Sequence, residues 1–589
     1  MRPIFTILLL SISLCYVAAQ ELIGGTNYNK VTVTTSSSSS SGSGEQTINE
    51  SGLSPNLNSS SRFLGQATLG ADYEHIVSTA DEGFETWIDD QFNQSRLFSL
   101  KDYVQELTDQ YITALAADGE DTSDVGPRRE FWRFAWWQYT MTSSDLLRNR
   151  VALALSEILV ISEMPDLTRQ PLGLASYYDL LLNHSFENYR DILFHVSMHP
   201  TMGEYLTHLK NDKTNREKNR FPDENYAREI QQLFSIGLYE LNQDGTQKLD
   251  GNGNPIPAYD NEDIAEFAKI FTGLSWGDSD QFRYYGQVDT SYTIPMKMHN
   301  RNHEPGAKFL LNGQVVPNRN PPDGMADVND AIDNLFNHPN TGPFVARRLI
   351  QRLVKSNPTP EYIARIAAKF ANNGSGIRGD MKAIIKAILL DPEARDCALK
   401  EDVAGGMLRE PIVRYTQVNR AFNASNAYSE FYNKTNDFKA NTEQRPLSSP
   451  SVFNFFQPDY QPIGAIADMG LFAPEFQITN SLSTVGYASE AHIWTFDEKP
   501  MEYGAVYGDY DQERQVRLDL EEELQLVNEG KINELVERFN LILAHGQLSE
   551  RTKEVIVNTV FEIPDTQPKV RLHMALFLTL MSPDYLILR

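Results

Sequence analysis

Hydrophobic residues recur along most of this chain every three or four positions, which is the spacing of amphipathic α-helices. In the segment 221–242, for example, Tyr226, Ile230 and Leu233 fall on one side of a helix, and that side is expected to pack inward. Strand-like alternation gathers only near 244–313, where Asn252 and Gly253 predict a tight hairpin turn. We therefore expect a mainly α protein, a large irregular multi-helical array with a small β-hairpin and loop insertion near 244–313.

The same periodicity, together with capping residues, predicts the limits of the individual helices. The expected helices cover 73–91, 101–117, 146–161, 174–182, 189–196, 328–337, 344–354, 360–370, 379–390, 410–421, 519–527, 532–544 and 570–581. The stretch 131–139 holds three of the six tryptophans and is expected in the core, with a sugar-stacking surface as the alternative. Asp327 is expected to cap the helix that follows it. Arg347 and Arg348 are expected to be solvated or in salt bridges.

The N-terminal 60 residues differ in character from the rest. Residues 1–20 combine a basic start, a short apolar run and small residues near the end, which is the pattern of a secretory signal peptide. Residues 21–60 are rich in Ser, Thr and Gly and are expected to form a flexible tether. Residues 61–589 form the expected helical body, with a candidate subdivision near 395–410. The predicted location is therefore secreted, either extracellular or periplasmic.

The chain is strongly acidic, with a net charge of −27 over 589 residues. This balance argues against nucleic-acid binding, because phosphate contacts need basic side chains. Beyond the signal peptide, no segment is apolar over the length needed for a membrane span. Removal of the signal peptide would leave Cys397 as the one cysteine, so no intramolecular disulfide is expected. An acidic surface can attract divalent cations, but the sequence identifies no cofactor.

The segment 221–242 also carries a polar face. Asn225, Glu229 and Gln232 follow one another at helical spacing, and Arg228 lies one turn from both Asn225 and Gln232. Such a face is either a solvated outer surface or a buried hydrogen-bonded hub. The sequence leaves both readings open.

The loop 276–313 is the predicted partner of this polar face. It contains His303 and Lys308, whose side chains could converge with Glu229 into an acid–base or anion-binding pocket. In that arrangement Glu229 or His303 is the general base, and Arg228 or Lys308 holds an anion. The alternative is a loop that hydrogen bonds fix onto a buried polar helix, with no chemistry.

Metal-ligand patterns are weak in this sequence. Asp250, Asn252 and Asn254 imitate the start of a calcium-binding loop, but Pro255 stands where that loop needs glycine. The sequence therefore favours a hairpin without metal. His195 and His199 have a metal-ligand spacing, yet no HExxH glutamate accompanies them, so they are expected in the core or at a helix cap.

Several sequence motifs, found in a fixed order along the chain, resemble those of a known family. They are HPTMGEYL (199–206), PDENYAREIQQLFSIGLYELN (222–242), IAEFAKIFTGLSW (264–276), NHEPGAKFLLNG (302–313), HPNTGPFVARRLIQRLV (338–354) and SSPSVFNFFQPDY (448–460). In this order they resemble the bacterial family called domain of unknown function 1800, over roughly residues 61–589.

The resemblance implies a large, mostly helical exported protein without an established activity. It also implies an exported sulfatase-like protein as a companion. Some relatives carry two histidines in a WHNHF-like stretch, whereas this chain has SEIL at 156–159. This departure weakens any metal site inferred from those relatives.

Two functional hypotheses follow, and the sequence does not establish whether the chain is an enzyme. The first is a non-catalytic scaffold or binding protein of the cell envelope or extracellular space. The second is an exported hydrolase, metal-assisted or not, acting on a carbohydrate, sulfated or peptide substrate. No G-x-S-x-G, P-loop, HExxH, paired CxxC or dinucleotide motif supports the second hypothesis.

Overall fold

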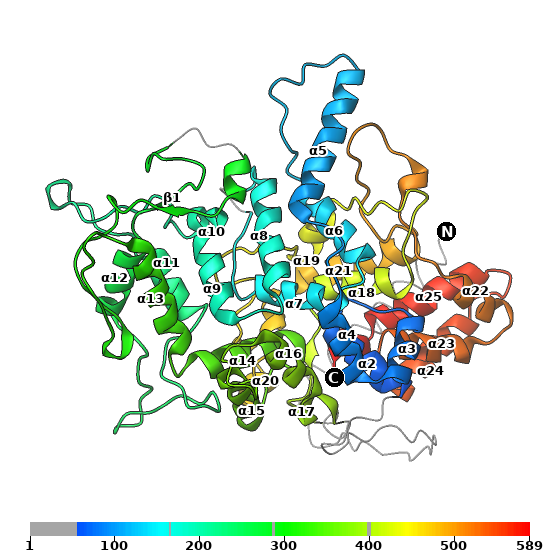
Figure 1. Cartoon of the computed structure of the whole chain (residues 1–589). Coiled ribbons are helices and arrows are strands. Elements are labelled where there is room, and N and C mark those ends of the chain that lie inside the picture. Colours follow the sequence, from blue (N-terminus) through cyan, green and yellow to red (C-terminus); the bar gives the residue numbers. More distant parts are fainter. Residues whose placement is uncertain (1–55, 164–166, 285–288, 397–401) are drawn as a thin grey trace.

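Helices form almost all of the regular structure, as predicted (Figure 1). The computed structural model describes residues 56–163, 167–284, 289–396 and 402–589. The predicted signal peptide, most of the predicted tether and Cys397 lie outside these residues. The small β elements near 244–313 are also confirmed and extend to Val316.

The first helices show how single residues set helix limits. They are α2 (Leu57–Ala67), α3 (Tyr73–Glu82), α4 (Phe84–Asn93) and α5 (Leu100–Ala117). α2 begins inside the stretch expected to be a tether, because the Asn56 side chain accepts a hydrogen bond from the Ser59 amide at 2.8 Å and caps the helix. The helix predicted over 73–91 is two helices, separated at Gly83, whose φ of 88° interrupts the helical backbone.

Three helices form the centre of the molecule: α6 (Phe131–Thr142), α7 (Leu146–Ser156) and α8 (Pro171–His184). Trp132, Trp136 and Trp137 of α6 are at most 1% exposed, so the aromatic stretch is core and not a surface platform. Full burial of a large apolar side chain contributes roughly 1.5–3 kcal/mol, which makes this cluster a major part of the core.

The residues of the predicted site lie at one side of these central helices, at the left of Figure 1. The helices there are α9 (Tyr189–Met198), α10 (Pro200–Tyr205), α11 (Asn225–Gln232), α12 (Asn261–Ile270) and α13 (Gly324–Asn337). Two short antiparallel pairs accompany them, β1 (Leu274–Ser275) with β2 (Lys297–Met298) and β3 (Lys308–Phe309) with β4 (Val315–Val316). The predicted hairpin is held by isolated bridges, among them Leu249 with Pro255.

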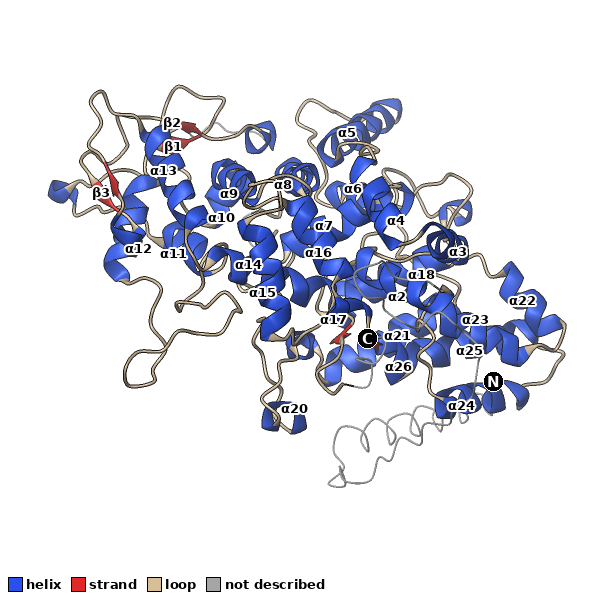
Figure 2. Cartoon of the chain, turned by 60° about the horizontal axis from the view of Figure 1, so that its bottom comes forward, coloured by secondary structure: helices blue, strands red, loops and turns tan. Residues whose placement is uncertain are grey.

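The second half of the chain is helical again (Figure 2). Its helices are α14 (Thr341–Leu353), α15 (Pro360–Ala371), α16 (Met381–Leu390), α17 (Pro392–Arg395), α18 (Pro411–Ala421), α19 (Asn436–Thr442), α20 (Ala465–Asp468), α21 (Ser481–Thr495), α22 (Glu521–Asn528), α23 (Ile532–Ile542), α24 (Glu550–Phe561), α25 (Pro568–Met581) and α26 (Pro583–Leu586). None of the helices among the described residues combines the length and the hydrophobicity that a membrane crossing requires.

One apolar core extends from Phe63 to Tyr585 and so includes both ends of the described chain. β5 (Met407–Leu408) pairs with β6 (Ile587–Leu588), and Leu588 is 1% exposed. β6 also packs against α2, and Figure 1 places the C-terminus beside that helix. The C-terminal residues therefore pack against the start of the helical body.

Candidate functional site

α11 is shorter than the helix predicted over 221–242 and covers only Asn225–Gln232. It ends there because the amides of Ile236 and Gly237 both bond to the Gln231 carbonyl, at 2.9 and 3.1 Å, and Gly237 has a φ of 73°. Tyr226 and Ile230 are at most 1% exposed, so the predicted inward side is correct for these two residues.

The polar face of α11 is partly solvated and partly buried, so it fits neither of the two simple readings. Asn225 is exposed, and Arg228 pairs with Glu224 at 3.5 Å with 42% of its side chain exposed. Glu229 is 7% exposed, and its Oε2 has no hydrogen-bond partner. Gln232 accepts a long hydrogen bond of 3.5 Å from the Tyr259 hydroxyl.

Glu229 lies among aromatic groups that do not ionise readily. Burial raises the pKa of the Glu229 carboxyl, and the charge of Arg228 only partly opposes this effect. Burial, with the nearby Glu229 charge, raises the pKa of Tyr205 and of Tyr259 to about 12. Glu229 is thus a carboxyl group whose neutral form the surroundings favour.

His303 and Lys308 lie together in a buried network with Asp327. His303 Nδ1 is 2.9 Å from the Thr272 carbonyl and must donate to it, while its Nε2 is 3.1 Å from Lys308 Nζ and 3.0 Å from Asp327 Oδ2. Lys308 also forms an ion pair with Asp327. The side chains of these three titratable residues are 3–4% exposed, so water has little access to them.

Asp327 is not the helix cap that the sequence predicts. α13 begins at Gly324, and Asp323 caps it by accepting a hydrogen bond from the Ala326 amide. Asp327 points into the interior, where Arg319 adds a second ion pair. Burial alone would raise the pKa of Asp327, but the bonds from His303 and Lys308 outweigh it and hold the pKa below its ordinary value.

The two predicted halves of the site belong to separate networks. Asn225, Arg228, Glu229 and Gln232 make no hydrogen bond or ion pair with His303 or Lys308, all of which the structure describes. Both halves pack against α12, α11 on one part of it and β3 on another. α12 itself begins with a capping box formed by Asp260 and Asp263.

The weak metal-ligand candidates, Asp250, Asn252 and Asn254, form hydrogen bonds with one another within a turn. Asp250 Oδ1 accepts the amides of Asn252 and Asn254 at 2.8 and 2.9 Å, and these bonds lower the pKa of Asp250. Across the described ranges, no three or more His, Cys, Asp or Glu side chains group as a metal site would require. His199 caps α10, as expected for a structural histidine, by accepting the Thr201 amide at 3.2 Å.

A buried carboxylate pair in the centre of the molecule is absent from the sequence-based candidates. Gln444 donates through Nε2 to Glu410 at 2.6 Å and to Glu157 at 3.5 Å. Arg352 contacts Glu157 at 3.4 Å. Burial and the neighbouring Glu410 charge raise the pKa of Glu157 well above its ordinary value, although the charge of Arg352 opposes the shift.

A small pocket opens beside this pair. Its empty volume of about 270 Å³ includes space open to solvent, and Ser156, Glu157, Gln444, Asn454 and Phe455 are among its lining residues. Asn454 Nδ2 is buried without a hydrogen-bond partner. Ser156 and Glu157 begin the SEIL segment, so the part of the chain that departs from the WHNHF-like pattern forms one wall of the pocket.

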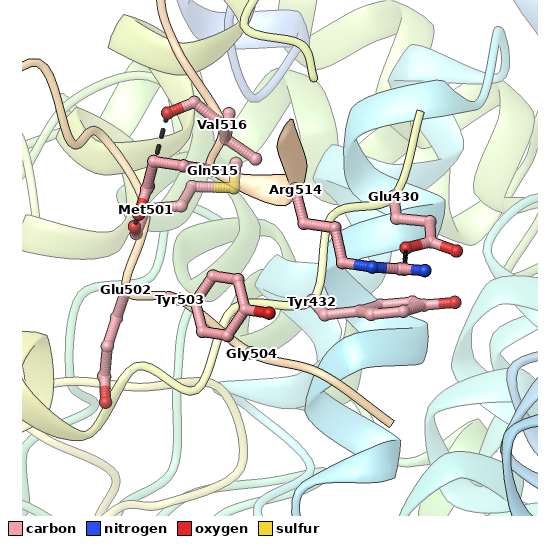
Figure 3. Close-up of a pocket in the computed structure, with 9 residues that line it drawn as sticks. All are labelled: Glu430, Tyr432, Met501, Glu502, Tyr503, Gly504, Arg514, Gln515 and Val516. Carbon is pink, nitrogen blue, oxygen red and sulfur yellow. Dashed lines mark hydrogen bonds and ion pairs between the residues drawn. The ribbon is translucent and has the colours of Figure 1, made fainter. Parts of the chain in front are cut away.

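A second pocket lies between the segments 430–432 and 501–516 (Figure 3). Arg514 crosses it toward Glu430, with which it forms an ion pair, and Tyr432 lies beneath them. Arg514 also stacks on the Tyr428 ring, with Cζ 4.3 Å from the centroid. Arg514 and Glu430 therefore neutralise each other. This makes the pocket a weaker candidate for binding a charged ligand.

Comparison with known proteins gives one match. The family model described as "Protein of unknown function (DUF1800)" matches residues 62–587, which is most of the chain. No curated protein matches the chain. No solved structure matches it either.

Proposed function

Because this chain belongs to the DUF1800 family, for which no function is known, we propose a role from its own residues: an exported, non-catalytic scaffold or binding protein of the cell envelope or extracellular space. The observation that carries the proposal is the buried network of His303, Lys308 and Asp327. A general base must reach a proton on a substrate, but His303 uses both ring nitrogens within the protein and is 4% exposed. These residues therefore fit a structural role better than a catalytic one.

Export is part of the proposal and rests on the signal-peptide pattern of residues 1–20. Intact-mass analysis of the protein recovered outside the cytoplasm should show a mature chain that begins near residue 21. A chain that keeps residue 1 and stays in the cytoplasm would contradict this part.

The family resemblance also motivates a partner, an exported sulfatase-like protein. Affinity purification of the native exported chain, followed by mass spectrometry and metal analysis of the same sample, should recover such a protein in a fixed ratio. Recovery of the chain alone at high yield would argue against the scaffold role.

A second candidate function is an exported hydrolase, and one observation favours it: Glu157, whose pKa is raised by burial, lies near Glu410 at the edge of a pocket. Two carboxyl groups with different protonation states are the usual means of acid–base hydrolysis. Purified mature chain should be assayed against polysaccharides, sulfated saccharides and peptides. Turnover that Glu157→Gln or Glu229→Gln abolishes would replace the scaffold proposal by the hydrolase, and the variant that loses activity would identify the site.

A further inference from the structure

Two neighbouring arginines of α14, Arg347 and Arg348, each lie against a phenylalanine ring. The guanidinium Cζ of Arg348 lies 5.0 Å from the ring centroid of Phe344, one turn earlier on the same helix. The Cζ of Arg347 lies 5.1 Å from the ring of Phe472, in the segment that follows α20. Both side chains are partly buried. Figure 2 shows α20 and its flanking loops below α14 and α15.

Of the two expected environments, solvent or a salt bridge, neither arginine shows the salt bridge. Within the described part of the chain, no carboxylate oxygen lies within 4.0 Å of either guanidinium. The one side-chain bond is from Arg348 Nη1 to Gln351 Oε1, at a long 3.4 Å.

Other buried arginines of this protein do find acceptors. Arg409 donates to the Leu543 carbonyl at 2.8 Å, and Arg378 donates to the Phe336 carbonyl at 3.0 Å. Arg352, one turn after Arg348, contacts Glu157 and stacks on the Phe456 ring at 4.5 Å. Among the described residues, Arg347 and Arg348 have no such carbonyl or carboxylate acceptor, although Arg409 also keeps one donor, Nη2, without a partner.

The pKa shifts of the two arginines also show that their charges are poorly compensated by the protein. Burial, together with the charges of Arg347 and Arg352, lowers the pKa of Arg348 to about 9, although Asp459 opposes the shift. Burial also lowers the pKa of Arg347. Both side chains are only partly exposed, and the charge of Arg347 acts on Arg348. Two like charges in such a place are unfavourable until an anion joins them.

We propose that Arg347 and Arg348 form a binding site for an oxyanion, that is, a carboxylate, sulfate or phosphate group, between α14 and the segment that contains Asp459 and Phe472. Guanidinium groups bind such ions through paired N–H donors, and the phenylalanine rings hold each guanidinium in plane. The chain has a net charge of −27, so its overall electrostatic field repels anions. The two arginines would therefore bind an anion by direct contact and not by long-range attraction.

The inference does not depend on the scaffold proposal, because the site would serve a binding protein and a hydrolase equally. The test uses the purified mature chain and isothermal titration calorimetry with sulfate, phosphate and acetate as free ions. Charge-assisted hydrogen bonds contribute roughly 1.5–3 kcal/mol each, so Arg347→Gln and Arg348→Gln should each weaken binding about 10-fold or more. Arg551→Gln on α24, an exposed arginine in no ion pair, is the matched control and should bind like wild type.

A second measurement separates a binding site from a structural role. Without anion, the Arg347→Gln/Arg348→Gln chain should unfold at the same or a higher temperature than wild type, because like-charge repulsion is removed. Absence of binding to all three ions, equal binding by the double variant, or marked destabilisation of that variant would each overturn the site. Oligosaccharides of one length that carry sulfate, phosphate or carboxylate groups would then identify the source of the oxyanion.

Discussion

At the residue scale, Asp327 is the carboxylate that connects three charged or titratable side chains next to the predicted site. It holds Lys308, Arg319 and His303, which come from segments before α13. Removing one partner of a buried ion pair leaves the other charges uncompensated, which is more damaging than losing a surface pair. The network therefore fixes the loop 299–319 to α13.

Asp327→Asn should accordingly lower the free energy of unfolding by about 3–5 kcal/mol, measured by urea denaturation at pH 7. The pKa of Asp327 is below its ordinary value in the fold, so its contribution is present above the unfolded pKa of roughly 3.9 and is lost as pH falls through the folded pKa. Variant and wild type should thus converge in acid. Asp330→Asn, which removes only a partly exposed partner of Arg319, should cost less than about 1 kcal/mol.

Glu475 should contribute to the pH dependence of stability in the direction opposite to that of Asp327. It is 1% exposed, and burial raises its pKa to about 8. The fold keeps the proton that the unfolded chain loses near pH 4.3, so stability from this group is complete below roughly 4.3 and declines as pH rises through 8. Glu475→Gln cannot titrate, and its urea midpoint should fall less than that of wild type between pH 5 and pH 8. A parallel decline in both proteins would show that other groups cause the dependence.

Sequence reasoning at this scale succeeded where the determinant was local. The inward side of Tyr226 and Ile230 follows from helical spacing. Asp327 was assigned to a helix cap although it lies only 19 positions after Lys308, because the direction of its side chain depends on the fold. The Glu157–Glu410 pair was missed because its members are 253 positions apart. Such pairs depend on packing that periodicity does not encode.

At the scale of elements, helices were predicted well and their limits less well. Gly83 divides one predicted helix into two, and the turn at Gly237 shortens another. At Gly83 the hydrophobic spacing continues across the break, so the pattern alone does not reveal it. The presence of a helix could therefore be predicted from the hydrophobic pattern. Its limits could be found only from the backbone conformation.

A glycine inside α21 serves a different purpose, the close approach of two helices. A Cβ on Gly486 would lie 2.0 Å from the carbonyl oxygen of Asn441 in α19, a distance that backbone atoms cannot accept. Gly486→Ala should therefore destabilise the protein by about 1–3 kcal/mol in thermal or urea unfolding, despite the higher helix propensity of alanine. Ser489→Ala, exposed on the same helix, should change stability by less than about 0.5 kcal/mol. A stabilised Gly486→Ala protein would mean that α19 and α21 can separate freely.

At the scale of the whole molecule, the continuous core joins regions that are far apart in the chain. Leu588 in β6 packs near Gly65 of α2, and its side chain is 1% exposed. Leu588→Ala should lower the free energy of unfolding by about 2–5 kcal/mol, as expected for a buried leucine. Arg589→Ala, exposed and next in sequence, should have an effect within about 0.5 kcal/mol. Similar losses for both variants would show that the end of the chain frays as a unit.

The contact between α2 and β6 has a consequence for the export proposed above, in which the N-terminus leaves the cytoplasm first. On that proposal, the apolar side of α2 would cross the membrane hundreds of residues before Leu588. It would remain exposed to chaperones and proteases until Leu588 emerges, so this interval would be the one in which the translocating chain is most easily degraded.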